Sequence, residues 1–197
     1  MASIGLRRFA RSVCVGLALL AASGCAAVHY QTVDRGRIDG KLTVEWIDRD
    51  VFRFIPDGED PLTFTRASGE RIVPGEMTTD GGSIPRPLWM LRDYSPWGYA
   101  PAFIVHDWLF EAHSCKLTGY EHYTVDTAAD ILSEVIKTMM ESDRFGGRNE
   151  LVLLSMDRAV RSPFARNAWD TGPCTIGDPQ PLRRRAPIAV YTLDYSN

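Results

Sequence analysis

The sequence predicts an α+β fold, in which a small antiparallel β-meander is followed by about three packed helices. In the first half of the chain, apolar and polar residues alternate with the period of two that half-buried strands show. In the second half, apolar residues recur at helical spacing. A segment rich in Pro and Gly separates the halves, and strands followed by helices are typical of the α+β class.

Short runs predict the strands. Residues 42–46 alternate between apolar and polar side chains, and the apolar run 51–55 ends at a Pro-Asp-Gly turn. The runs 62–65 and 71–73 flank an Ala-Ser-Gly-Glu turn and predict a hairpin. Residues 188–193 predict a late strand.

Three helices are expected after the loop-like segment 74–98. They cover about residues 99–113, 125–141 and 148–169, each with an apolar stripe along one side. A Gly-Gly pair separates the second helix from the third. The sequence therefore predicts one core-bearing domain over residues 41–170.

The ends of the chain have other expected roles. Residues 1–24 are predicted to be a signal peptide, 25–40 a polar tether, and 171–197 a tail containing Pro and Arg with the late strand inside it. The signal is predicted from three arginines without any acid, a short apolar core over 13–22, and small residues before Cys25.

Residues 19–25 resemble the bacterial lipobox, and this resemblance implies acylation of Cys25. The chain would then be a lipoprotein of the cell envelope, anchored to a membrane by its acyl chains. Ala26 follows the cysteine, which in a Gram-negative cell implies the periplasmic side of the outer membrane. The alternative is ordinary signal cleavage near Ala22 or Ala26, with Cys25 incidental.

Charge argues against a nucleic-acid partner. The chain has 22 basic and 25 acidic residues, and loss of Arg7, Arg8 and Arg11 with the signal leaves 19 basic residues and a net charge of −6. A nucleic-acid interface needs a basic face, which this composition does not favour.

Cys115 and Cys174 are the two cysteines that remain once Cys14 leaves with the signal and Cys25 is acylated. In an oxidising compartment we expect them to form a disulfide. Two free buried thiols are the alternative. Neither cysteine has the spacing typical of zinc ligands.

A polar cluster carries the catalytic hypothesis. His106 interrupts an apolar helix, and antiparallel packing of the next helix is expected to bring Asp130 to it, so that the carboxylate orients a general base. Asp107 and Asp80 are the predicted metal ligands, with Ser83 in the same polar loop, and calcium is the ion that such oxygen donors would hold.

A structural role for the same residues is the competing interpretation. The loop residues Asp80 and Ser83 are also typical of turn caps, and the three helix residues would then form a buried polar network that fixes helix packing.

Two family resemblances bear on these residues. The segments Thr79–Arg86 and His106–Phe110, with Asp130, resemble domain-of-unknown-function family 1353 of bacteria and phages over roughly residues 42–165. That resemblance implies a fold and a polar cluster, and no established activity. The pattern His106-Asp107-x-x-Phe110 with Asp130 also resembles the helix of secreted phospholipases A2, which implies His106 as base, Asp107 as calcium ligand and Asp130 as orienting residue.

Two functions follow as expectations. One is a membrane-tethered hydrolase that uses His106 and Asp130 on esters of lipid or cell-wall material. The other is a non-catalytic envelope lipoprotein, such as a phage-related binding or exclusion factor.

Overall fold

The structure is a computed structural model with the α+β class that the sequence predicts. It describes five ranges of the chain, namely residues 24–48, 51–79, 96–142, 147–176 and 186–196. Residues 1–23 of the predicted signal peptide, Asp80 and Ser83 lie outside these ranges.

The strands form two antiparallel sheets, whereas a single meander was expected. The larger sheet has the order β6-β3-β2-β7 and consists of Met77–Thr79, Val51–Pro56, Lys41–Asp48 and Ala189–Asp194. The smaller sheet has the order β1-β4-β5 and consists of Arg37–Asp39, Thr63–Thr65 and Arg71–Ile72. The predicted hairpin is therefore present as β4-β5, but β4 pairs with β1, from an upstream segment, and not with β3.

Gly40 joins the two sheets. Its φ of +87° lies in the left-handed region that favours glycine, and a Cβ atom there would lie 2.3 Å from the carbonyl oxygen of Pro61. This turn lets the chain leave β1 in one sheet and enter β2 in the other at once.

Between β6 and β7, the described residues form four helices and one 3-10 turn. They are η2 (Pro96–Tyr99), α2 (Ala100–Ser114), α3 (Val125–Met140), α4 (Glu150–Val160) and α5 (Pro163–Thr171). The N-terminal ends of α3, α4 and α5 are capped by Thr124, Asn149 and Ser162, whose side chains each accept a hydrogen bond from a backbone N–H of the first turn.

The prediction of one continuous third helix over residues 148–169 is wrong. It is divided between α4 and α5, because Pro163 has no N–H for an interior hydrogen bond and favours the first position of a new helix. The first two expected helices match α2 and α3 to within one residue at each end.

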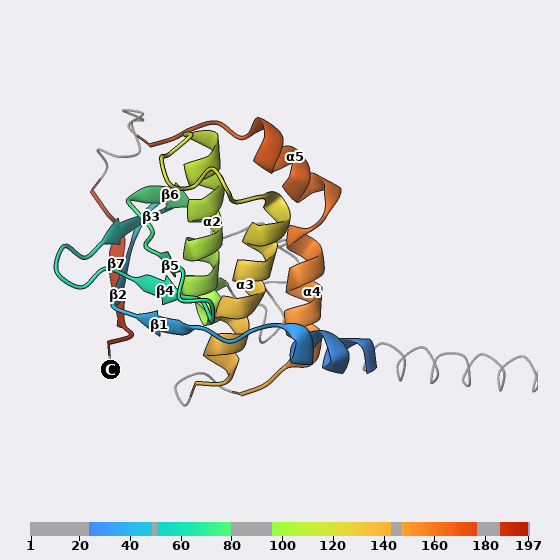
Figure 1. Ribbon diagram of the computed structural model, residues 1–197. Coiled ribbons are helices and arrows are strands. Elements are labelled where there is room, and N and C mark those ends of the chain that lie inside the picture. The colour runs from blue at the N-terminus through green and yellow to red at the C-terminus, as the bar shows by residue number, and fades with distance from the viewer. Residues whose placement is uncertain (1–23, 49–50, 80–95, 143–146, 177–185, 197) are drawn as a thin grey trace, which may run out of the picture.

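The core lies between the sheets and the helices. In Figure 1 the sheets lie on one side, and α2, α3 and α4 follow side by side with α5 near the end of α2. Phe54 and Phe64 from the two sheets and Leu109, Ile131 and Met139 from α2 and α3 are almost completely buried in one apolar cluster. None of the helices in these ranges has both the length and the apolarity that crossing a bilayer requires.

Residues 24–32 form an N-terminal helix, and this differs from the polar tether expected over residues 25–40. Ala26 and Tyr30 lie one turn apart and are 0% and 2% exposed. The ammonium of Lys137 donates to the carbonyls of Tyr30 and Val33, at 2.9 and 2.6 Å, near the end of this helix. The segment is therefore part of the packed domain, because its apolar residues cover α3.

Candidate functional site

Thr79, the one described residue of the first sequence motif, contacts the second motif in the middle of α2. Thr79, the last residue of β6, donates a hydrogen bond from Oγ1 to Oδ2 of Asp107 at 2.6 Å. The other carboxylate oxygen, Oδ1, lies 3.4 Å from Nδ1 of His106. Thr79, Asp107 and His106 thus form a polar chain, and the side chain of Asp107 is 21% exposed.

His106 itself is sealed from solvent. Its side chain is 2% exposed, its ring centroid lies 4.7 Å from that of Phe110, and its Nε2 is buried without a hydrogen-bond partner. A general base must reach the proton it removes directly or through one water. This burial resembles a packing network more than an open catalytic cleft.

The predicted pair of His106 and Asp130 is not formed. Asp130 is 56% exposed, and its Oδ1 accepts a hydrogen bond at 2.5 Å from a guanidinium nitrogen of Arg161. The reason is helical periodicity: Asp126, Asp130 and Glu134 follow one another at intervals of four and share one stripe of α3. That stripe lines the side of α3 on which Arg161, at the end of α4, lies.

Asp130 instead lies at the rim of a polar hollow of about 540 Å³ between the N-terminal helix, α3 and α4. Its lining consists of His29, Thr32, Val33, Asp34, Arg66, Asp130, Ser133, Glu134, Asp157 and Arg161. Ser133, Glu134 and Asp157 are buried polar residues among them.

The arginines of the hollow are held by carboxylates. Arg66 donates through Nε and one terminal nitrogen to both oxygens of Glu134, at 2.9 and 2.6 Å, and through the other to Glu70 at 2.9 Å. The hydrogen bonds to Glu134 hold the pKa of Arg66 above its ordinary value.

Arg161 donates to Asp157 at 2.9 Å as well as to Asp130. Burial lowers the pKa of Arg161, but the hydrogen bonds to Asp130 and Asp157 outweigh this effect and raise it. Both guanidinium groups stay charged, and their donors face carboxylates of the protein.

Of the residues that line this hollow, the sequence interpretation named only Asp130, and His29 is among those that it missed. Its Nε2 is buried without a hydrogen-bond partner and lies 3.9 Å from Oδ2 of Asp157. Residues 26, 30 and 33 are apolar at helical spacing, and this signal would have placed His29 on a helix.

Among the described residues that line the hollow, the serine hydroxyl and the histidine are not paired. Ser133 is 1% exposed, and its hydroxyl donates to Oδ1 of Asp157 at 3.1 Å, so its proton is directed to a carboxylate and not to the histidine. Nucleophilic catalysis by serine needs the base within hydrogen-bond reach of the hydroxyl. Carboxylate oxygens of the buried Glu134 and Asp157 lie in its lining.

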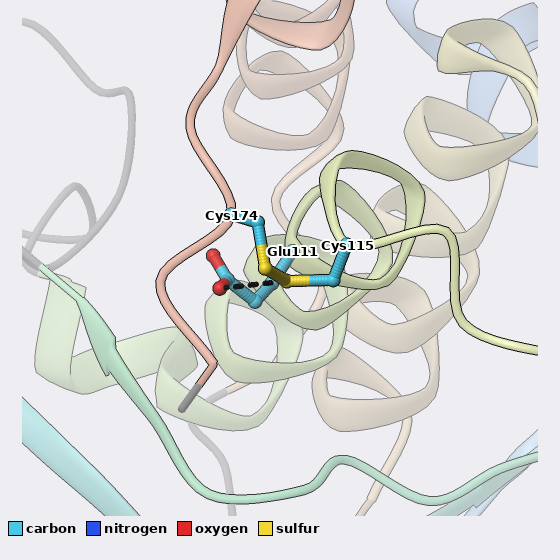
Figure 2. A group of neighbouring side chains, drawn as sticks. All are labelled: Glu111, Cys115 and Cys174. Carbon is cyan, nitrogen blue, oxygen red and sulfur yellow. Dashed lines mark hydrogen bonds between the residues drawn. A yellow bond between two sulfur atoms is a disulfide. The ribbon is translucent and has the colours of Figure 1, made fainter. Parts of the chain in front are cut away.

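Cys115 and Cys174 form the disulfide that was expected, across 59 residues of chain. Figure 2 shows it beside Glu111, which comes from the last turns of α2. The carboxylate Oε1 lies 3.4 Å from the sulfur of Cys115, and this is a contact without a proton, because disulfide sulfurs have none.

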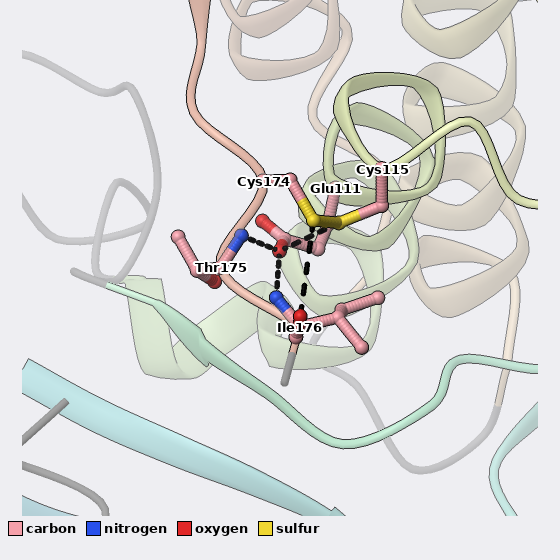
Figure 3. Close-up of a disulfide and its surroundings, with 5 residues drawn as sticks. All are labelled: Glu111, Cys115, Cys174, Thr175 and Ile176. Atoms are coloured by element: carbon pink, nitrogen blue, oxygen red, sulfur yellow. Dashed lines mark hydrogen bonds between the residues drawn. A yellow bond between two sulfur atoms is a disulfide. The ribbon is translucent and has the colours of Figure 1, made fainter. Parts of the chain in front are cut away.

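The Glu111 carboxylate has a structural task at this position. Its Oε1 accepts hydrogen bonds from the backbone N–H groups of Thr175 and Ile176, at 2.5 and 2.7 Å (Figure 3). Two sulfurs joined in a disulfide have no thiolate charge to offer a metal ion.

Within the described part of the chain, no other group of three His, Cys, Asp or Glu side chains converges as metal ligands would. The calcium site at Asp107 and Asp80 stays a prediction, because Asp80 is outside the described residues.

The comparisons with known proteins bear on one part of the chain. A family model with the description "Protein of unknown function (DUF1353)" matches residues 59–145. This range contains the Thr79, His106, Asp107 and Asp130 positions, whereas His29 and Asp157 lie outside it. No curated protein and no solved structure matches the chain. Through residues 59–145, the chain is similar to the DUF1353 family of proteins of unknown function.

Proposed function

We propose that this protein is a lipoprotein of the bacterial envelope, acylated at Cys25, and that its domain acts by binding a ligand in the polar hollow. The observation that carries the anchoring is the state of Cys25. It is a free, exposed cysteine, and the next residue, Ala26, is completely buried against the domain. A thiol at this position is open to modification, and an anchor there would hold the domain at the membrane surface.

The disulfide supports export. A structural disulfide persists in oxidising compartments such as the periplasm and is rare in the cytosol. Cys115 and Cys174 therefore agree with the signal peptide that the first residues predict.

Metabolic labelling with palmitate tests the anchor. The full chain, expressed in a bacterium with the lipoprotein pathway, should incorporate label, and Cys25→Ser should abolish it. Cys14→Ser is the matched control and should keep the label, because Cys14 leaves with the signal. Label that persists in Cys25→Ser would disprove acylation at this residue.

Binding is favoured over hydrolysis by the surroundings of the two histidines. His106 is buried and does not meet Asp130, and His29 does not meet Ser133. The hollow, by contrast, has the size of a small-molecule site and several polar side chains that converge on it.

A second candidate, an ester hydrolase, rests on one specific observation. Asp107 touches both Thr79 and His106, so it can orient a base whose other nitrogen is unpartnered. A screen of ester substrates with and without calcium tests it, using His106→Gln as the variant. Hydrolysis that His106→Gln loses while its circular dichroism is unchanged would establish the hydrolase and overturn the binding proposal.

A further inference from the structure

We propose that the polar hollow binds a primary ammonium group, of the kind found in a phosphatidylethanolamine headgroup or in a small soluble amine. This inference rests on the proposed binding function and names the class of ligand. Four observations support it: the net charge of the lining, the hydrogen-bonding capacity that the protein leaves unused, the absence of convergent metal ligands in the described residues, and the distance to Cys25.

The charge of the lining favours a cation. Two arginines and four acidic residues line the hollow, so its net charge is −2 with His29 neutral. Three of the polar groups, Ser133, Glu134 and Asp157, are buried in its floor. Low dielectric at buried positions strengthens the attraction between a carboxylate and an incoming cation.

The polar atoms of the hollow that the protein leaves without a hydrogen bond are acceptors. Arg66 and Arg161 direct their nitrogens to carboxylates and a carbonyl of the protein, so they offer little to an anion. Oδ1 of Asp157 accepts hydrogen bonds from Ser133 and Arg161, whereas Oδ2 accepts none from the described residues and lies 3.9 Å from Nε2 of His29.

His29 supplies the second acceptor. Its Nε2 has no hydrogen-bond partner, although its side chain is 23% exposed where that of His106 is 2% exposed. An unsatisfied buried polar atom is costly unless a water or a ligand meets it. When the ring proton is on Nδ1, Nε2 accepts a hydrogen bond. A primary ammonium has three N–H donors, so it can meet His29 and Asp157 together and keep one donor for a further oxygen.

A metal ion is a poorer fit. Three convergent His, Cys, Asp or Glu ligands are not found at this hollow among the described residues. Calcium requires six to eight oxygen ligands, and zinc in proteins typically requires three or four protein ligands. One carboxylate oxygen and one imidazole nitrogen suit an organic cation that forms directed hydrogen bonds.

The position of the hollow relates it to the membrane. Cys25 and His29 lie one turn apart on the N-terminal helix, which places them on the same side and about 6 Å apart along its axis. Acyl chains on Cys25 would bring the hollow to the level of lipid headgroups. The ammonium of a headgroup is therefore within reach, and a soluble amine is the other source of the same chemistry.

Titration calorimetry with two matched probes tests the ligand class. The purified full chain in detergent is titrated with ethanolammonium chloride and with choline chloride, which has the same charge and no N–H donor. Ethanolammonium should bind at least about tenfold more tightly, because loss of hydrogen bonds to a charged partner costs that factor or more. Equal affinity for the two probes, or no binding of either, would overturn the proposal.

Variants of the hollow identify the site. His29→Gln and Asp157→Asn should each weaken ethanolammonium binding by at least about tenfold, for the same reason. Asp170→Asn removes an exposed acid on α5 that does not line the hollow, and its affinity should be that of the wild type. Because Asp157 is buried and its substitution can unfold the chain, His29→Gln is the deciding variant: unchanged affinity in it would contradict the assigned site.

Nanodiscs distinguish the two sources of ammonium. In discs of phosphatidylcholine with added phosphatidylethanolamine, a bound headgroup should compete and weaken ethanolammonium binding relative to discs of phosphatidylcholine alone. Equal affinity in both kinds of disc would assign the hollow to soluble amines. The detergent titration needs no acylation, so its failure is distinguishable from a failure of the palmitate labelling.

Discussion

Arg161 holds Asp130 at 2.5 Å on the solvent side of the helical layer, while His106 lies buried in α2 beside Asp107. The carboxylate that was expected to orient a catalytic base therefore has an arginine as its partner. It contributes to a polar hollow whose histidine is His29.

This relationship predicts a small effect of Asp130→Asn. The ion pair is solvent-exposed, so its loss should change the free energy of unfolding by less than about 1 kcal/mol, measured by urea denaturation. His106→Ala removes a buried ring and should cost about 2–4 kcal/mol. The nuclear magnetic resonance signals of His106 should be the same in Asp130→Asn as in the wild type. A change in these signals would show that the two side chains are coupled.

The disulfide predicts a large loss of stability on reduction. It closes a loop of 59 residues between α2 and the segment after α5, and the chain-entropy model gives roughly 4 kcal/mol for a loop of that length. The double variant Cys115→Ser/Cys174→Ser should therefore unfold at clearly lower urea concentration than the wild type. Dithiothreitol should destabilise the wild type by a similar amount and leave the double variant unchanged. If reduction has no effect on the wild type, the disulfide does not form in solution.

The lowered pKa of Glu70 predicts that the folded protein loses stability in acid. Burial raises its pKa, but hydrogen bonds from Tyr123, His122 and Arg66 outweigh that and lower the pKa from its ordinary value of 4.5 to about 2. A lowered pKa means stability that is present above pH 4.5 and lost as the pH falls toward 2. The loss should be about 1–2 kcal/mol after solvent screening, since the side chain is partly exposed.

Glu70→Gln is the control for this pH dependence. The free energy of unfolding is measured between about pH 6 and pH 2 for both chains, and the difference between them should shrink as the pH falls through about 4.5. A difference that stays constant over this range would mean that Glu70 has its ordinary pKa in the folded protein.

Alanine substitutions at Gly40 and Gly58 test the backbone conformation at the turn between the two sheets. Gly40→Ala should lower stability by about 1–3 kcal/mol, because its positive φ and the carbonyl of Pro61 both oppose a Cβ atom. A Cβ atom added at Gly58 would meet nothing within 4 Å, and its φ is not positive, so Gly58→Ala should change stability by less than about 0.5 kcal/mol. Equal thermal stability of the two variants would contradict the sharp turn between the two sheets.

Local patterns predicted the elements better than their partners. The apolar stripes predicted the ends of α2 and α3 to within one residue, because helical periodicity depends on residues within one turn of each other. Ser162-Pro163 contained the signal for a helix break that the apolar pattern concealed. The division into two sheets arises because β4 pairs with β1 and not with β3. The sequence of a single strand does not determine which strand it pairs with.

The candidate site was harder to predict for the same reason. Which residue Asp130 contacts depends on the side of α3 on which it lies. Asp126 and Glu134, each four residues from Asp130, already indicated a polar stripe on the side of α3 away from its apolar contact with α2. His29 was assigned to a tether on composition, although Ala26 and Tyr30 are spaced as on a helix. Thr79 contacts Asp107, whereas the loop residues Asp80 and Ser83, which were expected near Asp107, lie outside the described residues.

Intact-mass analysis of the mature protein extracted from membranes tests the anchoring at Cys25. We expect an N-terminus at Cys25 with a mass increase equal to a diacylglyceryl group and an amide-linked acyl chain. An N-terminus at any other residue, or Cys25 with an unmodified thiol, would contradict it.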